Sequence, residues 1–152
     1  MKNTTLCYIE KDDRYLMLYR NRKDQDENKG KWIGVGGKLE EGESPEECLI
    51  REVAEETGLI LTGYKRRGLI TFVSDEWGTE YMHLFLGTAY EGELGECDEG
   101  ELKWIDKSDV MDLNLWEGDR IFLKALMDTD DYISMKLSYK GDELVACERY
   151  QA

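Results

Sequence analysis

The sequence predicts an α+β or α/β fold in which helices cover a mixed β-sheet. Segments with strand composition occur before, between and after two or three helical segments, and short turn-like stretches join several of them. The chain has 152 residues, of which 41% are hydrophobic, and this is enough to bury one core. No linker or internal repeat divides the sequence. We therefore expect a single domain over residues 1–152.

A β-hairpin is predicted near the N-terminus. Residues Thr5–Glu10 and Arg14–Arg20 are rich in β-branched, aromatic and long apolar side chains, and Lys11-Asp12-Asp13 between them has turn composition. After a polar stretch, Trp32 and Ile33 begin a short strand that runs into a glycine-rich loop. The chain is thus expected to reach its first helix through this loop.

The first helix is predicted over Ser44–Gly58. Ser44 has the side chain of an N-cap, and Pro45 lacks an amide hydrogen that the first helical position does not need. Glu47 completes a capping box with Ser44, and Gly58 supplies the stop. Local sequence therefore specifies both ends of this helix.

The rest of the chain predicts three strands, a second helix and a closing hairpin. The strand segments are Tyr64–Val73, Glu80–Tyr90 and Leu102–Ile105. In Asp119–Met127 the apolar residues recur at helical spacing. Residues Tyr132–Tyr139 and Glu143–Glu148 form the closing hairpin. We expect all strands to belong to one sheet system.

Charge and hydropathy exclude several classes of partner. Acidic residues number 34 against 20 lysines and arginines, and the resulting formal charge of −14 disfavours binding to a nucleic-acid polymer. No apolar run approaches the length of a membrane span, and the N-terminal residues lack a signal-peptide pattern. We expect a cytoplasmic protein without a membrane partner.

Cysteine and histidine usage limits the available chemistry. The four cysteines, Cys7, Cys48, Cys97 and Cys147, are far apart and are expected to be reduced thiols that act as small apolar residues. His83 is the single histidine, so a multi-histidine zinc site or a Ser-His-Asp triad lacks its residues. Any catalysis would therefore rest on carboxylates.

The first predicted helix carries an unfavourable acidic cluster. Glu52, Glu55 and Glu56 share one face at i, i+3 and i+4, where like charges repel, and the last helical turn disfavours anions. A solvated acidic face is one interpretation. Arg51 within the cluster and the nearby loop Gly34–Gly42 favour another, a Mg²⁺ site built from carboxylates and a loop carbonyl.

Residues Gly37–Leu59 resemble the Nudix box, G-x5-E-x7-R-E-U-x-E-E-x-G-U with U aliphatic, without a mismatch. The resemblance implies an α/β/α sandwich around a mixed sheet. It also implies hydrolysis of a nucleoside diphosphate linked to another moiety, with Mg²⁺ as cofactor and Mn²⁺ as an alternative.

The resemblance assigns roles within the box. Glu52, Glu55 and Glu56 would be metal ligands, together with the Gly37 carbonyl. Arg51 would orient a glutamate, and Glu43 would be a structural or accessory acid. Either Glu56 or Glu52 would be the general base.

Sequences outside the box are similar to the MutT-like branch of the family, which destroys oxidised purine triphosphates such as 8-oxo-dGTP. The similar segments are Lys31–Lys38, Asp98-Glu99 and Leu115–Asp119. This similarity implies that Glu99 is a further metal ligand or base, that Trp116 stacks on the purine, and that Asp119 hydrogen-bonds to its edge.

Two positions depart from the branch. Ile33 stands where its animal enzymes carry a base-recognising asparagine, and Gly118 replaces the first of two adjacent aspartates. An apolar Ile33 would read the shape of a base rather than its hydrogen bonds.

Other candidates are single residues. Arg20 and Lys38 could bind a triphosphate, and Phe72 could line the base pocket or belong to the core. The basic triplet Lys65-Arg66-Arg67 is interpreted as a solvated strand end.

Three functions are therefore considered. The first is Mg²⁺-dependent hydrolysis of 8-oxo-dGTP-like triphosphates to a monophosphate and pyrophosphate, by a monomer or homodimer whose partner is a small nucleotide. The second is an ADP-ribose, NADH or nucleotide-sugar pyrophosphatase. The third is a non-catalytic nucleotide-sensing module, which would not need the unfavourable acidic cluster.

Overall fold

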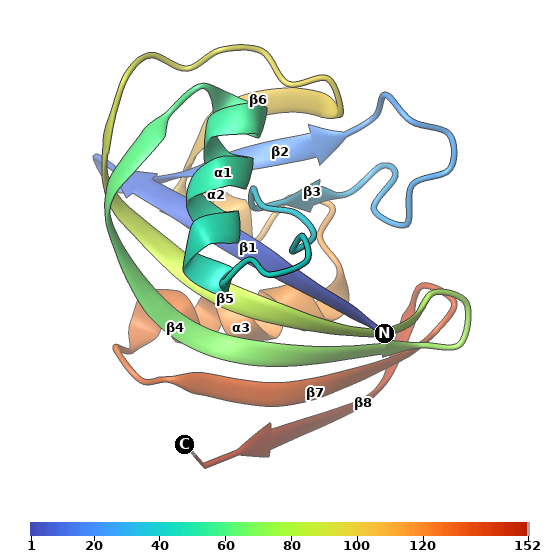
Figure 1. The fold of residues 1–152 in the computed structure, drawn as a ribbon. Helices are drawn as coiled ribbons and strands as arrows, with labels where there is room; N and C mark the ends of the chain where they lie inside the picture. The colour runs from blue at the N-terminus through green and yellow to red at the C-terminus, as the bar shows by residue number, and fades with distance from the viewer. Residues whose placement is uncertain (152) are drawn as a thin grey trace.

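A mixed sheet of eight strands organises the molecule (Figure 1). The computed structural model describes residues 1–151. The strands are β1 (Lys2–Lys11), β2 (Arg14–Arg20), β3 (Trp32–Ile33), β4 (Ile60–Ser74), β5 (Gly78–Glu91), β6 (Gly100–Asp106), β7 (Ile133–Lys140) and β8 (Glu143–Tyr150). Their order is β3-β2-β1-β5-β4-β7-β8, and β6 pairs with β2. The sheet is mixed, as predicted, because β1 runs parallel to β5 and β4 runs parallel to β7.

Strands β1 and β2 form the predicted hairpin but pair only beside their turn. Asp12 and Asp13 have φ angles of 52° and 61°, as in the primed turns that suit tight hairpins. Pairing covers Glu10 with Tyr15 and the next residue pair. Beyond the turn, β1 continues along β5, whereas β2 continues along β6. The two strands therefore diverge.

The glycine-rich loop after β3 lies against β1 where β2 has diverged. Val35 bridges Cys7, with the Cys7 amide donating to the Val35 carbonyl at 2.6 Å. Lys38 bridges Thr4 further along the same strand. These bridges fix the loop between β1 and the first helix.

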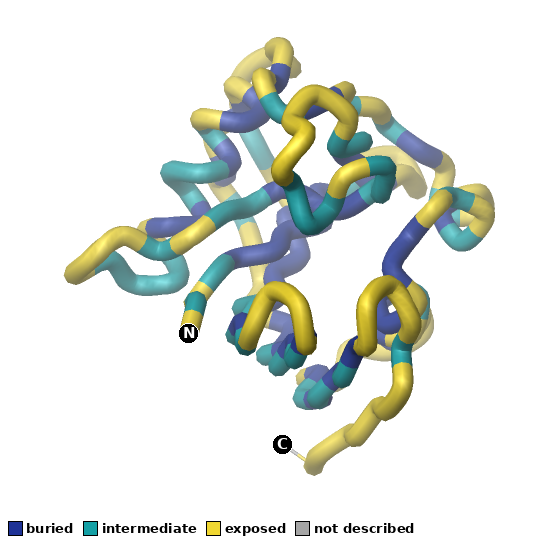
Figure 2. Tube along the Cα trace, turned by 90° about the vertical axis from the view of Figure 1, so that its right-hand side faces the viewer, coloured by how far each residue is buried: buried dark blue, intermediate teal, exposed yellow. Residues whose placement is uncertain are grey.

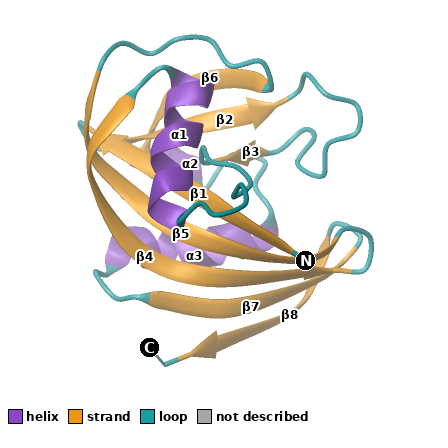
Figure 3. Ribbon diagram, in the orientation of Figure 1, coloured by secondary structure: helices purple, strands orange, loops and turns teal. Residues whose placement is uncertain are grey.

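Helices cover both faces of the sheet (Figure 3). Their bounds are α1 (Pro45–Thr57), α2 (Lys107–Val110) and α3 (Glu117–Asp128). Helix α1 buries Leu49 and Val53, and α3 on the other side buries Phe122, whose ring centroid lies 6.3 Å from that of Tyr8 in β1. The predicted α/β/α arrangement is confirmed. The four-residue helix α2 was not predicted.

The ends of α1 are those that the sequence predicts. The Glu47 amide donates to the Ser44 hydroxyl, and the Ser44 amide donates to the Glu47 carboxylate, each at 3.0 Å. Pro45 is the first helical residue, and Gly58 follows the last. A capping box of this kind stabilises a helix by roughly 1 kcal/mol.

The interpretation of Lys65-Arg66-Arg67 as a solvated strand end is wrong for Arg67. This side chain is buried in the middle of β4. Its guanidinium donates to the carbonyls of Thr129 at 2.7 Å and Asp131 at 3.1 Å, beyond the end of α3. Carbonyls at the end of a helix lack partners within the helix, and Arg67 donates hydrogen bonds to them. These carbonyls are more than 60 positions away in sequence, so the contact forms only in the folded chain.

Burial along the chain is uneven (Figure 2). The edge strand β8 is exposed along most of its length and carries the free thiol of Cys147. The free thiols of Cys7, Cys48 and Cys97 are buried and pack as small side chains. Each helix among residues 1–151 is too short or too polar to span a lipid bilayer.

Candidate active site

Arg51 connects helix α1 to the loop before it. Its Nε donates to Glu43 Oε2 at 2.7 Å and its Nη2 donates to Glu43 Oε1 at 2.9 Å, a bidentate pair. Its Nη1 donates to Glu52 Oε1 at 2.8 Å and to Glu55 Oε2 at 3.2 Å. Its Nη2 also donates to the Lys38 carbonyl at 3.1 Å. Arg51 therefore fixes the loop, and it contacts two of the predicted metal ligands.

The charge of Arg51 changes the titration of its partners. Hydrogen bonds from Arg51 lower the pKa of Glu43 to about 2. Burial raises the pKa of Glu52, although the Arg51 guanidinium opposes the rise. Glu43 is thus a permanent anion that anchors Arg51, whereas Glu52 is shielded from solvent and closer to protonation.

Glu56 lies on the buried side of α1. The Gly36 amide donates to its Oε1 at 2.7 Å. Its Oε2 is buried without a hydrogen-bond partner among residues 1–151. Burial raises the pKa of Glu56 to about 8, and the charges of Glu99 and Glu52 act in the same direction. A buried carboxylate oxygen without a partner is costly unless a proton or a cation reaches it.

Gly37 allows the loop to approach Glu52 closely. A Cβ atom added at Gly37 would lie 2.5 Å from Glu52 Oε2 and 2.6 Å from Oε1, so a side chain at position 37 would displace the Glu52 carboxylate. The Gly37 carbonyl accepts a hydrogen bond from the Thr5 amide at 2.8 Å. The neighbouring Gly36 carbonyl accepts none from the described residues, so it joins Gly37 as a candidate loop ligand.

Glu99, from the loop before β6, faces the same region from the other side. It pairs with Arg20 at 3.0 Å and with Lys23 at 3.1 Å. Burial acts to raise the pKa of Glu99, but the charges of Arg20 and Lys23 outweigh it and hold that pKa below its usual value. Arg20 also donates to Asp26 at 2.8 Å, so both sides of its guanidinium are already paired.

The predicted ligands do not form a closed cluster as the side chains stand. Within residues 1–151 no three acidic, histidine or cysteine side chains lie close enough together to hold a metal ion. Arg51 draws Glu55 outward, where it is exposed, and basic residues hold Glu99. Among the described residues, the buried carboxylate oxygen that has no hydrogen-bond partner is Glu56 Oε2.

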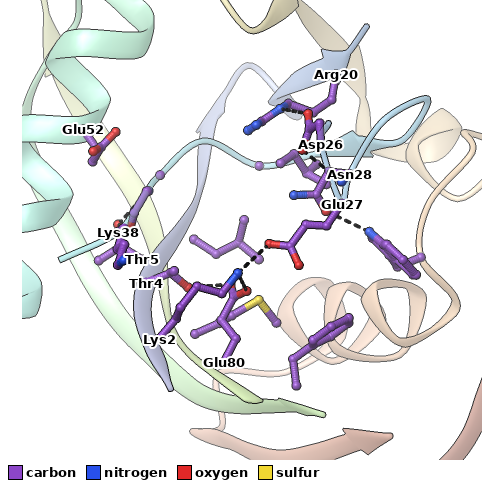
Figure 4. Close-up of a pocket in the computed structure, with 18 of the residues that line it drawn as sticks. Lys2, Thr4, Thr5, Arg20, Asp26, Glu27, Asn28, Lys38, Glu52 and Glu80 are labelled. Carbon is purple, nitrogen blue, oxygen red and sulfur yellow. Dashed lines mark hydrogen bonds and ion pairs between the residues drawn. The ribbon is translucent and has the colours of Figure 1, made fainter. Parts of the chain in front are cut away.

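A cavity of about 410 Å³ is lined by Glu52 and Glu99 of this region and by the aromatic pair Phe72 and Trp116, which we call its apolar end; Figure 4 draws the cavity with Glu52 labelled. This volume suits a small-molecule ligand. Nine of the predicted site residues line it: Arg20, Ile33, Gly37, Lys38, Glu52, Phe72, Glu99, Trp116 and Asp119. Arg51, Glu55 and Glu56 lie outside its lining.

Trp116 forms a wall of the apolar end. Its Nε1 donates to Asn28 Oδ1 at 2.8 Å. Its ring contacts Phe72 and Tyr139 edge to face, at centroid distances of 5.7 and 5.1 Å. The Lys31 ammonium lies 5.0 Å from the ring centroid. Trp116 is therefore held rigidly by its neighbours, and Phe72 belongs both to the core and to the pocket.

Asp119 lies on the first turn of α3 and is buried. Its carboxyl group has no hydrogen-bond partner among the described side chains. Burial raises the pKa of Asp119 to about 8, and the charge of Glu80 acts in the same direction. At neutral pH this carboxyl group is mostly protonated, so it has one O–H donor and one acceptor oxygen to offer a ligand.

Sequence reasoning missed a second group of charged residues in the cavity. Lys2 pairs with Glu27 at 3.0 Å and with Glu80 at 3.4 Å. The Thr4 hydroxyl donates to Glu80 at 2.8 Å. No motif marks these residues, because they come from separate segments. The one available signal was period-two alternation, which places Glu80 on the same side of β5 as Met82, another lining residue.

Comparisons with known proteins agree with this geometry. The NUDIX domain family matches residues 2–126. The Nudix hydrolase YvcI of Bacillus subtilis is 33% identical over 132 residues, 84% of this chain and 80% of that protein. An oxidized purine nucleoside triphosphate hydrolase of Danio rerio is 28% identical over 145 residues, 95% of this chain and 90% of that protein.

A solved structure is similar over nearly the whole chain. It is the crystal structure of a MutT protein from Bacillus halodurans, with a TM-score of 0.88, 29% identity, and coverage of 98% of this chain and 97% of that one. The family match covers the box, strands β1 to β6 and helix α1, and the structural match covers nearly the whole chain. This chain therefore belongs to the NUDIX domain family.

Proposed function

We propose that this protein hydrolyses oxidised purine nucleoside triphosphates, such as 8-oxo-dGTP, to the monophosphate and pyrophosphate. The observation that carries the proposal is the shared cavity, which has Glu52 and Glu99 at one end and Phe72, Trp116 and Asp119 at the other. A nucleotide has the same division into an anionic and an aromatic part. The relative from Danio rerio is named for this activity.

Divalent metal ions are the general cofactors of Nudix hydrolases, and the residues of this site fit such an ion. Glu56 has a buried oxygen without a partner, and Glu52 lies against the Gly37 backbone. Carboxylates and carbonyls are the ligands of hard cations, so Mg²⁺ is the proposed ion, with Mn²⁺ as an alternative. The proposed ligands are the carboxylates of Glu52, Glu55, Glu56 and Glu99 and the Gly37 carbonyl.

A bound divalent ion would offset phosphate charge and lower the pKa of an attacking water. The chain itself contributes the remaining functions. Arg51 holds Glu52 in one orientation, Lys38 supplies positive charge for the phosphates, and Arg20 would do so in exchange for one of its two carboxylate partners. Glu56 Oε2 or Glu52 would take the proton from water, and the charge of a bound cation would keep these carboxylates ionised although burial raises the pKa of both groups.

The apolar end would hold the base. Trp116 and Phe72 offer aromatic surface, and Ile33 adds an apolar contact without a hydrogen-bonding group. Asp119, whose pKa is raised by burial, can donate to a base carbonyl or accept from an amine. The partner would be a small nucleotide rather than a nucleic-acid polymer, because the protein carries a formal charge of −14.

Product identification tests the proposal. The protein is incubated with Mg²⁺ and 8-oxo-dGTP, dGTP, ADP-ribose or NADH, and products are separated by ion-exchange chromatography. We expect 8-oxo-dGMP and pyrophosphate from 8-oxo-dGTP. Consumption of ADP-ribose or NADH alone would favour the second function, and nucleotide binding without any hydrolysis would favour a sensing module.

A further inference from the structure

The apolar end of the cavity contains an ion-paired group that the box does not supply. Position 33 is isoleucine and position 118 is glycine, so neither can hydrogen-bond to a base through its side chain. Polar side chains instead come from Lys2, Glu27 and Glu80, which line the same cavity as Asp119. We call Lys2, Glu27 and Glu80 the acidic clamp.

The clamp joins three segments that are distant in sequence (Figure 4). Lys2 begins β1, Glu80 lies near the start of β5, and Glu27 belongs to the loop between β2 and β3. The Lys2 ammonium donates to Glu27 Oε1 at 3.0 Å and lies 3.4 Å from Glu80 Oε1. The Thr4 hydroxyl fixes the other oxygen of Glu80 at 2.8 Å. Glu80 is therefore held in one orientation.

The clamp has an excess of hydrogen-bond acceptors. Two carboxylates oppose one ammonium group, and each carboxylate has about four lone-pair positions, of which these contacts use one or two. The side chains of Glu27 and Glu80 are only 20% and 12% exposed, so water reaches their oxygens poorly. A ligand that donates N–H groups to these oxygens would therefore be stabilised, whereas the edge of a base that presents lone pairs would be repelled.

We propose that the acidic clamp makes this site selective for guanine-type bases, whose N1–H and 2-amino groups are adjacent donors that one carboxylate can accept together. This inference rests on the proposed nucleotide substrate. The adenine ring places an acceptor nitrogen beside its 6-amino group, so the same carboxylate would face a lone pair. Glu80 is the central residue, because Lys2 and Thr4 hold it in place. Paired parallel hydrogen bonds to a carboxylate combine strength with geometric selectivity.

The test compares dGMP with dAMP, which share the purine ring and differ at the 2 and 6 positions, and in dAMP both ring nitrogens beside the 6-amino group are acceptors. Binding is measured by titration calorimetry without metal, so the result does not depend on turnover. We expect the wild type to prefer dGMP and Glu80→Gln to reduce that preference at least about fivefold. Glu91→Gln, an exposed change on the same strand, is the control.

A second variant keeps the inference testable if Glu80→Gln does not fold. Glu27→Gln lies in a loop, leaves the sheet untouched, and should reduce the same preference to a smaller extent. Thermal unfolding of each variant shows whether it is folded. Equal wild-type affinity for the two nucleotides, or an unchanged preference in folded Glu80→Gln, would overturn the inference. Selective binding without hydrolysis of any triphosphate would instead reject the proposed function and leave the clamp assignment standing.

Discussion

The Tyr139 hydroxyl accepts a hydrogen bond from the Gly118 amide at 2.7 Å, which joins strand β7 to the first turn of α3. Gly118 lies between Trp116 and Asp119, and β7 lies outside the residues matched by the NUDIX family. A Cβ atom at position 118 would lie 2.7 Å from this hydroxyl and 2.5 Å from Leu137 Cδ1. The closing hairpin thus occupies the space that an aspartate would need at position 118.

Replacing Tyr139 with Phe should disturb the pocket more than the fold. The change leaves the buried Gly118 amide without its acceptor, a loss of about 1–3 kcal/mol. We expect a lower Tm and a higher KM for 8-oxo-dGTP, with kcat changed less than about threefold. Steady-state kinetics and thermal unfolding measure these effects.

Tyr150→Phe is the matched control, because that hydroxyl is exposed and bonds only to Glu148 on its own strand. A Tyr139→Phe protein with the KM of the wild type would show that β7 does not position the pocket.

Stability should depend on pH through Asp119. Its pKa is raised from 3.8 to about 8 by burial, so the folded protein retains a proton that the unfolded chain has lost. This contribution to stability is complete below the unfolded pKa and is lost as pH rises through about 8. The slope can reach about 1.4 kcal/mol per pH unit for one proton.

Asp119→Asn should reduce the slope by the contribution of one proton, while Glu56, whose pKa burial also raises to about 8, keeps its own contribution. Thermal unfolding of the nucleotide-free variant and of the wild type is compared between roughly pH 4 and 9, a range that covers the window from the unfolded pKa of 3.8 to the folded pKa of about 8. Asp142→Asn in an exposed turn serves as the control. If the Tm curves of wild type and Asp119→Asn stay parallel across the window, Asp119 is not the group responsible.

Arg51→Lys should lower turnover although it keeps the charge. A lysine ammonium cannot make two parallel hydrogen bonds to Glu43 and also reach Glu52. With the orientation of Glu52 lost, we expect kcat for 8-oxo-dGTP to fall at least about tenfold, with a smaller change in KM.

Arg14→Lys tests the same chemical change at an exposed ion pair with Asp106, where we expect wild-type kinetics. Wild-type kcat in Arg51→Lys would mean that positive charge alone is sufficient at this position.

Local signals explain which parts of the fold could be predicted. Ser44, Glu47 and Gly58 specify the ends of α1 through contacts within a few residues, and these ends are confirmed. The parallel pairing of β1 with β5 depends on contacts between residues about 80 positions apart, as between Lys2 and Glu80, and no local pattern encodes it. Arg67 was misinterpreted for the same reason, since its acceptors belong to the end of α3.

The candidate site also has one part that the sequence predicted and another that it did not. Arg51, Glu52 and Glu43 lie within one motif, and the predicted contact between Arg51 and a glutamate is present. The acidic clamp has no motif, because its members meet only when β1, β5 and the loop after β2 are assembled. The oligomeric state remains a prediction of monomer or homodimer.

The most direct test of the account is the turnover of Glu56→Gln with 8-oxo-dGTP and Mg²⁺. Glutamine keeps the shape of this buried side chain but removes its charge and its ability to accept a proton. We predict a kcat at least about 100-fold below the wild type and an unchanged or higher Tm, since glutamine fills the same space and cannot carry the charge that burial disfavours at this position. Glu41→Gln, exposed in the loop before α1, should match the wild type. Near-normal kcat in Glu56→Gln, or failure of that variant to fold, would contradict the account.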